Sequence, residues 1–401
     1  VLAAGLRPEA PVSQVMSQPV KTIDANAPIF AALQLMLENN IHHLAVVDGA
    51  TIIGIISGTD LLRHQINNPL YLRRTLDHLR EPSALGNYAS EIAALVEKLF
   101  TGGVSATEIG RIVSSLNDAL VRRLVYLGEQ SLGAPPAPFA WIVFGSEGRL
   151  EQALLTDQDN GLIYESESAA AQTYFTALAN YLVETLIQVG FPPCAGGYMA
   201  TKWCKPLSEW QKLFSRRIQT PEPQALLDSA IFFDFRAVAG ELSLTPLEKI
   251  LAGAGHEKLF LYHMIRGALE FRPPLGFFNR IRTDNGKVDL KKGGIGPIVA
   301  LARAAGLCAA SHERSTVARL KAAGASGSLL TSENARTLGD IFSFLLHLRL
   351  RRQLTAYRHK EPLDHAISLA ELSTLERRHL QEALVMIKLT QDALMLDSGY
   401  P

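Results

Sequence analysis

A glycine–serine turn followed by two carboxylates is the feature that most constrains this chain. The apolar run 139–144 is expected to form a buried strand that ends at Gly145-Ser146, and a second short strand is expected to carry Asp157 and Asp159. Side chains at positions i and i+2 of a strand point to the same face, so the two acids are expected to converge beside the turn. Hard divalent cations bind oxygen ligands, and Mg²⁺ commonly takes one or two carboxylates together with substrate phosphates. The pattern therefore predicts a site for phosphate and metal.

Length, charge and cysteine content limit the remaining possibilities. A chain of 401 residues suggests two to four domains. Lys+Arg and Asp+Glu both total 39, and this zero net charge argues against nucleic-acid binding by bulk electrostatics. The three cysteines are widely spaced without a CxxC motif, which predicts neither a disulfide framework nor a zinc site and favours a reducing cytoplasm. No apolar run is long enough for a membrane span, and no signal peptide is visible. The chain begins at Val1 rather than Met, so we expect a fragment of a longer protein.

The N-terminal part has the pattern of a compact α/β unit. Strands are expected at 19–23, 43–48 and 52–56, with a helix at 28–39 and a last helix capped by Ser57-Gly58-Thr59-Asp60. This order resembles a CBS domain. The resemblance implies a module that works in pairs and binds adenine nucleotides.

Two features of the CBS resemblance leave its ligand open. Ser57 and Asp60 stand at the positions of the family's ribose-contacting Ser/Thr-x-x-Asp, but both residues could equally be helix caps alone. Only one complete unit is present, and Val1 to Leu6 is expected to be the tail of a missing first unit. A second chain is then expected to complete the pair, which gives a homodimer through the CBS units.

The rest of the chain is mostly helical in pattern. Apolar residues recur at three-to-four spacing between 92 and 124, with Thr107 expected to cap the second helix of this region. From about Leu242 to Leu396 nearly all of the sequence is helical in pattern, which suggests a bundle, interrupted by a glycine-rich loop near Lys291.

Two further charged residues are candidates for the site. Arg149 follows the glycine–serine turn, where its fork of donors could hold a triphosphate oxygen. Asp234 interrupts the apolar, β-prone run 230–236, and a charge in such a run is costly unless it is paired or bound to metal. Asp234 is therefore the candidate third carboxylate of a two-metal site. A structural pair with Arg236, or an exposed strand face, is the other interpretation.

These motifs resemble the DNA-polymerase-beta-type nucleotidyltransferase superfamily. GSEGRLEQALLTDQDN and IFFDFRAVAGE are similar to the PII-uridylyltransferase branch, and closer still to a family that joins CBS domains to a predicted nucleotidyltransferase. The resemblance implies that Gly145 and Ser146 hold the nucleotide phosphates. It also implies that Asp157, Asp159 and Asp234 are catalytic residues that hold two Mg²⁺ ions.

The resemblance also predicts an α+β multidomain fold: a CBS unit, a polymerase-beta-like nucleotidyltransferase domain and a C-terminal helical bundle. The expected ranges are 1–66 for CBS, 67–132 for a helical linker, 133–240 for the transferase and 241–401 for a substrate-binding bundle. Lys291, in the sequence DLKKGGI, resembles the Lys–Gly-Gly loop of uridylyl- and adenylyltransferases, which implies a mobile loop that closes over the triphosphate. A plain helix–helix connection with solvated lysines explains it equally well. We expect Trp203 and Trp210 to pack in the core rather than to stack on a base.

The expected function is Mg²⁺-dependent transfer of NMP from an NTP to an acceptor hydroxyl. The resemblance points to a protein acceptor, as in the uridylyltransferases, and to regulation by adenine nucleotide at the CBS unit. The sequence contains no His-Asp dipeptide, so the hydrolase that reverses the reaction in PII-uridylyltransferases is not expected. The alternative is a non-catalytic module that senses nucleotide and signals by interaction. The base of the NTP and the identity of the acceptor depend on pocket shape and do not follow from the sequence.

Overall fold

The structure is a computed structural model that describes residues 11–14, 16, 18–62, 69–152, 154, 157–222, 226 and 230–397. The chain divides into two compact units, residues 1–75 and 76–401. The tail of a first CBS unit that we expected at Val1 to Leu6 lies outside the described residues. None of the helices in the described ranges is long and apolar enough to cross a bilayer.

The first unit contains a three-stranded sheet in the order β1-β2-β3. Strand β1 runs parallel to β2, and β2 pairs with β3 as an antiparallel hairpin with a register shift between Val46 and Val47. Helix α1 ends at Asn40, whose left-handed backbone (φ 53°) closes its C-terminus. The order and position of these elements confirm the pattern expected from the sequence. The bounds are β1 Thr22–Asp24, α1 Ile29–Asn39, β2 His43–Asp48, β3 Thr51–Ser57, α2 Gly58–Leu62 and α3 Pro69–Asp77, after a 3₁₀ turn η2 at Val12–Gln14.

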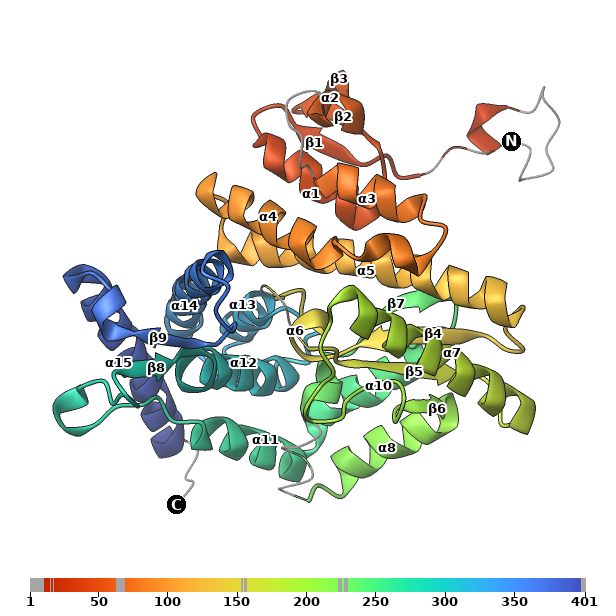
Figure 1. The fold of residues 1–401 in the computed structure, drawn as a ribbon. Coiled ribbons are helices and arrows are strands. Elements are labelled where there is room, and N and C mark those ends of the chain that lie inside the picture. The colour runs from red at the N-terminus through yellow and green to blue at the C-terminus, as the bar shows by residue number, and fades with distance from the viewer. Residues whose placement is uncertain are drawn as a thin grey trace. The chain divides into compact units, whose positions relative to one another are not determined.

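A four-stranded sheet in the order β6-β5-β4-β7 organises the second unit (Figure 1). Strand β4 pairs with β5 and β7 in antiparallel fashion, and β5 pairs with β6 in parallel. Every residue of β4 and β5 is buried, which explains why β4 is a continuous apolar run rather than an alternating one. The bounds are β4 Phe139–Val143, α6 Gly145–Gly148, β5 Asn160–Tyr164, α7 Ala169–Val189, β6 Cys204–Pro206, α8 Leu207–Gln219, η4 Ala230–Asp234 and β7 Arg236–Gly240.

An aromatic cluster fills the core below the end of β4. Phe144, Trp203, Trp210 and Phe232 have ring centroids 4.4 to 6.0 Å apart. Trp210 is fully buried, and the indole N–H of Trp203 donates to the carbonyl of Gly197. The core-packing interpretation of the two tryptophans is therefore confirmed.

Two helices precede the sheet, and the second of them packs against it. Helix α4 spans Tyr88–Thr101 after a 3₁₀ turn η3 at Pro82–Leu85, and α5 spans Ala106–Leu132. Ser105 caps α5 in a capping box with Glu108, so the cap that we predicted at Thr107 is wrong by two positions. Helix α5 contacts α7, β7 and α14. The guanidinium of Arg236 on β7 donates to both oxygens of Asp118 on α5 at 2.6 and 2.9 Å, which fixes the helix to the edge of the sheet.

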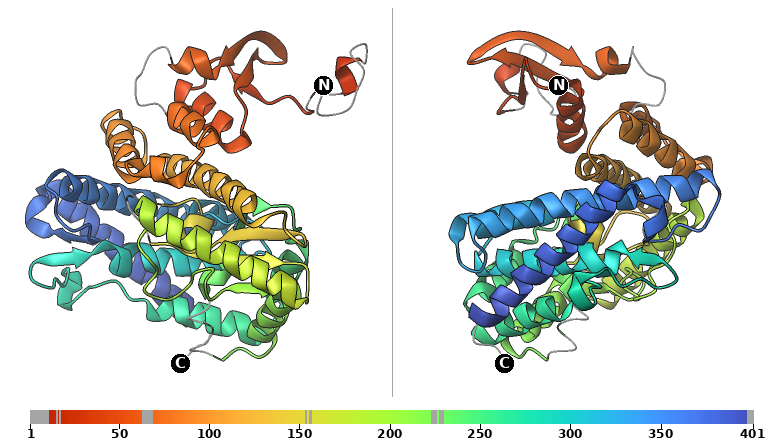
Figure 2. Two further views of the ribbon diagram at one scale, coloured as in Figure 1. Left: turned by 45° about the vertical axis from the view of Figure 1, so that its right-hand side comes forward. Right: turned by 90° about the vertical axis from the view of Figure 1, so that its left-hand side faces the viewer.

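The C-terminal helices lie beside the sheet, and α6 lies between the sheet and this helical region (Figures 1 and 2). The region is not wholly helical, because β8 and β9 form a two-stranded antiparallel sheet. The predicted loop at Lys291 is instead a π-helical turn, η7, that leads directly into α12. The bounds are α10 Thr245–Gly253, η5 Ala254–His256, α11 Lys258–Glu270, η6 Phe277–Asn279, β8 Lys287–Asp289, η7 Lys291–Ile295, α12 Gly296–Cys308, α13 Thr316–Ser326, α14 Ser332–Arg358, β9 Ala366–Ser368, η8 Leu369–Glu371 and α15 Thr374–Asp397.

Close packing explains why the turn at Lys291 is fixed. A Cβ on Gly293 would lie 2.7 Å from a side-chain atom of Pro274, and one on Gly294 would lie 2.6 Å from the side chain of Leu345. The two glycines therefore let η7 approach its neighbours closely.

A similar contact at Gly148 gives a testable prediction about the short helix α6. A Cβ at Gly148 would lie 2.0 Å from the carbonyl oxygen of Asp234, so the backbones of α6 and η4 touch there. We expect Gly148→Ala to lower the free energy of unfolding by about 3 kcal/mol, because neither backbone can move without disturbing the sheet. Chemical denaturation measures this difference.

Gly339 provides the matched control. It lies inside α14, and a Cβ there meets nothing within 4 Å. Gly339→Ala is expected to stabilise the protein by about 1 kcal/mol through helix propensity. Equal effects of the two substitutions would contradict the contact between α6 and η4.

Candidate functional site

The two acids of the motif are held by the polar residues that alternate with them. The amide nitrogen of Gln158 donates to the carbonyl of Phe191 at 3.1 Å, and the side-chain oxygen of Asn160 accepts from the backbone of Ala200 at 2.8 Å. Both amides are buried on one side of an extended segment. Alternation then directs Asp157 and Asp159 to the opposite side. The acids lie in the extended residues just before β5 rather than within the strand, but they converge as the i, i+2 spacing predicted.

A third side chain joins the acids. One ligand atom from each of Asp157, Asp159 and Cys194 lies within 4.8 Å of the others, and this is the group of potential metal ligands found among the described residues. Cys194 comes from the loop after α7. Sequence reasoning missed it because the cysteines were considered only for disulfide and zinc spacing, and no local motif links Cys194 to the acids.

The donor set fits a divalent cation. Oδ1 of Asp159 is buried and has no hydrogen-bond partner, which is costly for a carboxylate oxygen unless a cation completes it. Burial first, and then the charge of Asp157, raise the pKa of Asp159 to about 6, although a hydrogen bond from the thiol of Cys194 opposes them. Carboxylates such as these two are the ligands that Mg²⁺ or Mn²⁺ uses in proteins.

The glycine of the turn lies directly against these acids. Gly145 has a left-handed backbone (φ 54°), and a Cβ there would lie 3.0 Å from Oδ2 of Asp159. Glycine is therefore required both by conformation and by space. Ser146 follows in α6, half-buried, and its carbonyl accepts from the backbone of Glu151 at 2.8 Å. The structure thus brings Gly145, Ser146, Asp157 and Asp159 into one place.

Basic side chains from the C-terminal region lie near the acids. Lys291 is exposed, and its charge lowers the pKa of both Asp159 and His365. Burial first, and then Arg349 and Lys291, lower the pKa of His365 to about 4. The imidazole is neutral at physiological pH, and its Nδ1 accepts from Nε of Arg349 at 3.2 Å. The predicted nucleotide-binding Lys291 therefore lies close to the acidic pair, with Arg349 and His365 as neighbours that the sequence did not indicate.

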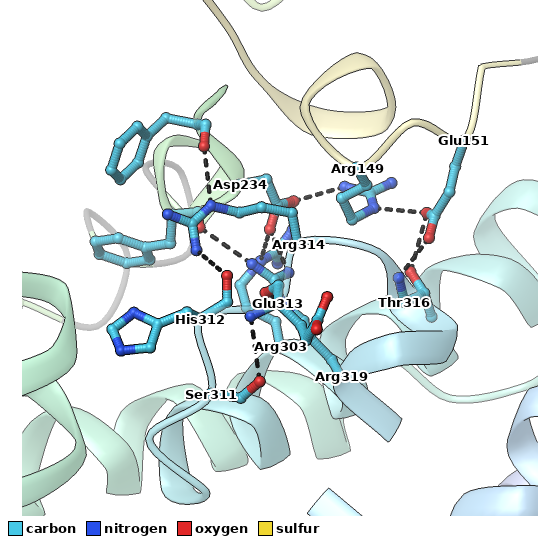
Figure 3. A network of polar contacts seen from close by, with 12 residues as sticks. Arg149, Glu151, Asp234, Arg303, Ser311, His312, Glu313, Arg314, Thr316 and Arg319 are labelled. Atoms are coloured by element: carbon cyan, nitrogen blue, oxygen red, sulfur yellow. Dashed lines mark hydrogen bonds and ion pairs between the residues drawn. The ribbon is translucent and has the colours of Figure 1, made fainter. Parts of the chain in front are cut away.

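Asp234 is placed differently from the prediction. It ends the 3₁₀ turn η4 and does not lie in a strand, and its carboxylate is fully buried among three arginines (Figure 3). Oδ2 accepts from Arg149 at 2.5 Å and from Arg303 at 2.6 Å, and Oδ1 accepts from Arg319 at 2.5 Å. We call these four residues the arginine cage.

The positive charges of the arginine cage affect the pKa of Asp234 more than burial does. Burial alone would raise the pKa of Asp234, but Arg303, Arg319 and Arg149 hold it well below its usual range. The residue is not in the group of metal ligands formed by the other two acids within the described residues. Its predicted pair, Arg236, binds Asp118 instead. The arrangement is that of a buried counter-ion, because both carboxylate oxygens already accept hydrogen bonds from guanidinium groups.

Arg149 connects the turn to the helical region. Its Nε donates to Glu151 at 2.7 Å, and its Nη1 donates to Asp234. Glu151 in turn accepts from the backbone N–H and the hydroxyl of Thr316, at the start of α13. Two nitrogens of the fork that we assigned to a triphosphate are therefore bonded within the protein.

A buried glutamate lies behind the turn. Burial first, and then the charges of Asp118 and Asp159, raise the pKa of Glu147 to about 8, although Arg236 opposes them. Glu147 is therefore mostly protonated at neutral pH. A neutral acid adds no further negative charge next to Asp159, which leaves the local charge to be balanced by a cation and Lys291.

The predicted CBS ligands form a capping box. Oγ of Ser57 donates to Asp60 at 2.5 Å, the backbone N–H of Ser57 donates to the same oxygen at 2.9 Å, and the backbone N–H of Asp60 donates to the serine hydroxyl at 3.2 Å. This reciprocal pattern stabilises the start of α2. The structure therefore contains the helix cap that is one of the two interpretations of Ser57 and Asp60.

Comparison with known families agrees with this architecture. Residues 12–67 match the CBS domain, residues 90–224 match "Putative nucleotidyltransferase DUF294", and residues 258–397 match "Putative nucleotidyltransferase substrate binding domain". The chain belongs to the family of CBS-containing proteins with this nucleotidyltransferase domain and its substrate-binding domain. No curated protein matches the chain.

The arginine cage predicts a strong effect on stability. Asp234→Asn keeps the shape of the side chain but leaves three buried arginines without their counter-ion, so we expect a loss of about 3–5 kcal/mol in the free energy of unfolding. Since the pKa of Asp234 is lower in the folded than in the unfolded protein, its contribution is complete above about pH 4 and is lost as the pH falls further. Urea titrations at pH 7 and pH 3 measure the difference.

The control is Asp340→Asn, because Asp340 is an exposed acid on α14. Its effect is expected to stay within about 0.5 kcal/mol. A loss of less than about 1 kcal/mol for Asp234→Asn at pH 7, or a difference from wild type that does not narrow at low pH, would show that the carboxylate is not the counter-ion of the cage.

Proposed function

We propose that this chain is a metal-dependent nucleotidyltransferase that moves NMP from an NTP to an acceptor hydroxyl. The observation that carries the proposal is the convergence of Asp157 and Asp159 beside Gly145, with the buried Oδ1 of Asp159 lacking a partner. The family match supports the same class of reaction. The acceptor oxygen attacks the α-phosphorus, the bond from that phosphorus to the bridging oxygen breaks, and pyrophosphate leaves.

Each part of the site has a proposed role in this reaction. Asp157 and Asp159 hold Mg²⁺, which supplies Lewis-acid stabilisation of the charge on the phosphoryl oxygens. The backbone of Gly145 and Ser146 contacts the triphosphate, because glycine allows close approach. Lys291 binds the β- or γ-phosphate from the opposite side as a point charge. The three groups come from separate segments of the second unit, so together they can hold the nucleotide from two sides.

The structure changes the roles that we propose for Asp234 and Arg149. Because both oxygens of Asp234 are bonded to arginines, we propose that it positions the site and does not hold a metal. Arg149, bonded to Glu151 and Asp234, connects the phosphate-binding turn to α13 through Thr316. Both residues then act through the position of the turn and do not contact the nucleotide.

Finer aspects of the function rest on the family resemblance. We propose a hydroxyl on a protein as the acceptor, as in the PII-uridylyltransferases. We also propose that adenine nucleotide binds the CBS unit at Ser57 and Asp60 and changes the rate of transfer. Because the two residues cap α2, nucleotide binding there has to replace or share the bonds of the capping box. Calorimetry with ATP and AMP on wild type and Asp60→Asn tests this part separately.

The central prediction concerns turnover. Wild type is incubated with Mg²⁺, a cell lysate and each labelled NTP in turn, and both pyrophosphate and label in macromolecules are measured. We expect Asp157→Asn and Asp159→Asn each to lower the rate about a thousandfold, because loss of a metal ligand removes several kcal/mol of transition-state stabilisation.

Asp340→Asn again serves as the control and is expected to keep the wild-type rate. If wild type releases no more pyrophosphate than the two active-site variants with any NTP, the enzymatic proposal fails. A nucleotide-sensing module without turnover would then explain the same acids, and nucleotide binding without product would identify it.

A second prediction concerns Lys291. Lys291→Ala is expected to raise the KM for the NTP about tenfold, which corresponds to about 1.4 kcal/mol of lost phosphate binding, with a smaller change in kcat. The matched control is Lys292→Ala, since Lys292 is also exposed and its backbone N–H donates to Asp289. Equal effects of the two substitutions would mean that only the net charge of the turn matters.

A further inference from the structure

Cys194 is fixed relative to the two acids by the backbone. The N–H of Gln158 donates to the carbonyl of Pro192 at 3.0 Å, and the N–H of Asn160 donates to the carbonyl of Tyr198 at 2.9 Å. Gln158 also forms a parallel bridge with Pro193. The loop that carries Cys194 therefore runs beside the acidic segment, with a hydrogen bond to it on either side of the cysteine.

The geometry of the group suits one cation. The sulfur of Cys194 and one oxygen from each of Asp157 and Asp159 lie within 4.8 Å of one another. Protein ligands bind tetrahedral Zn²⁺ at about 2.0–2.3 Å, so two ligands of one ion lie about 3.5 Å apart. Binding of one ion then requires these side chains to rotate toward one another. The thiol of Cys194 hydrogen-bonds the carboxylate of Asp159, and Oδ1 of that carboxylate is buried without a partner of its own.

Sulfur at this position changes which cation is preferred. Carboxylates bind Mg²⁺ and Mn²⁺ well, whereas a thiolate favours Zn²⁺ and similar softer metals. The other two cysteines have no such environment among the described residues: Cys204 lies in β6, Cys308 ends α12, and neither belongs to the group of potential metal ligands.

We propose that Cys194 is the third protein ligand of the catalytic cation, and that it makes the site bind Zn²⁺ or Co²⁺ more tightly than Mg²⁺. The inference that this cation is catalytic rests on the proposed function, but the metal site itself can be tested without turnover. Cys194 then occupies the role that the sequence assigned to Asp234. When the sulfur binds the cation, the thiol proton is released to the solvent.

The consequence is a site with two kinds of occupant. With Mg²⁺ the two carboxylates and the nucleotide phosphates supply the ligands, and the thiol contributes little. With a softer metal all three protein side chains bind it, and it can be held before the nucleotide arrives. The identity of the metal therefore decides whether Cys194 takes part.

Titration of the metal-free 401-residue chain with Co²⁺ tests the proposal, with absorption recorded in the near ultraviolet. A sulfur–cobalt bond gives a charge-transfer band there, which carboxylates alone do not give. We expect the band in wild type and in Cys204→Ser, and no band in Cys194→Ser. Cobalt affinity in Cys194→Ser is expected to fall at least about tenfold, as is typical when a metal site loses a supporting group. Mg²⁺ affinity should change less than about twofold, since Mg²⁺ favours oxygen ligands.

Several outcomes would overturn the proposal. These are an unchanged band or cobalt affinity in Cys194→Ser, a band that is lost in Cys204→Ser, or equal losses of Mg²⁺ and Co²⁺ affinity. Thermal unfolding of Cys194→Ser and of a second variant, Cys194→Ala, shows whether the fold is kept. A charge-transfer band that depends on Cys194 and disappears in Asp159→Asn supports the metal site even if no NTP is turned over. Failure of the metal-site proposal can therefore be told apart from failure of the proposed enzymatic function.

Discussion

The arginine cage around Asp234 is the interaction on which the second unit depends. One carboxylate from η4 accepts from Arg149 next to the glycine–serine turn, from Arg303 on α12 and from Arg319 on α13. A buried pair of this kind adds little net stability over apolar packing, but removal of one partner is costly. Its main effect is geometric, because it fixes the sheet, the turn and the C-terminal helices relative to one another. The candidate metal ligands and Lys291 lie on segments that neighbour the ones joined by the cage, so the cage affects whether they meet.

The direction of the two acidic side chains, Asp157 and Asp159, follows from strand alternation. Buried amides at Gln158 and Asn160 are satisfied by backbone groups, and their neighbours therefore point the other way. Backbone hydrogen bonds from the same two residues to the loop after α7 bring Cys194 to the acids. A single strip of backbone pairing thus sets both the direction of the carboxylates and the position of the thiol.

The sequence predicted a large part of the fold from local patterns. The elements of the first unit, strand β4 and the capped helices follow from apolar spacing and turn residues, which act over a few positions. The prediction of a strand at Asp234 was wrong because the short aromatic run 230–233 packs as a 3₁₀ turn in the aromatic core. The predicted loop at Lys291 was wrong because close contacts of Gly293 and Gly294 with Pro274 and Leu345 hold the turn in place. In both cases tertiary packing overrode local preference.

The sequence by itself determined that Asp157 and Asp159 share a face beside a glycine that must approach them, because strand alternation and glycine geometry are local properties. Only the tertiary structure decided what the other charged groups do. Asp234 has the residue type of a metal ligand, yet three arginines, each more than sixty positions away along the chain, make it a counter-ion. Cys194 has no motif, yet it lies beside the acids. The physical reason is that the role of a charge or a thiol depends on burial and on neighbours, and these are set by contacts between distant segments.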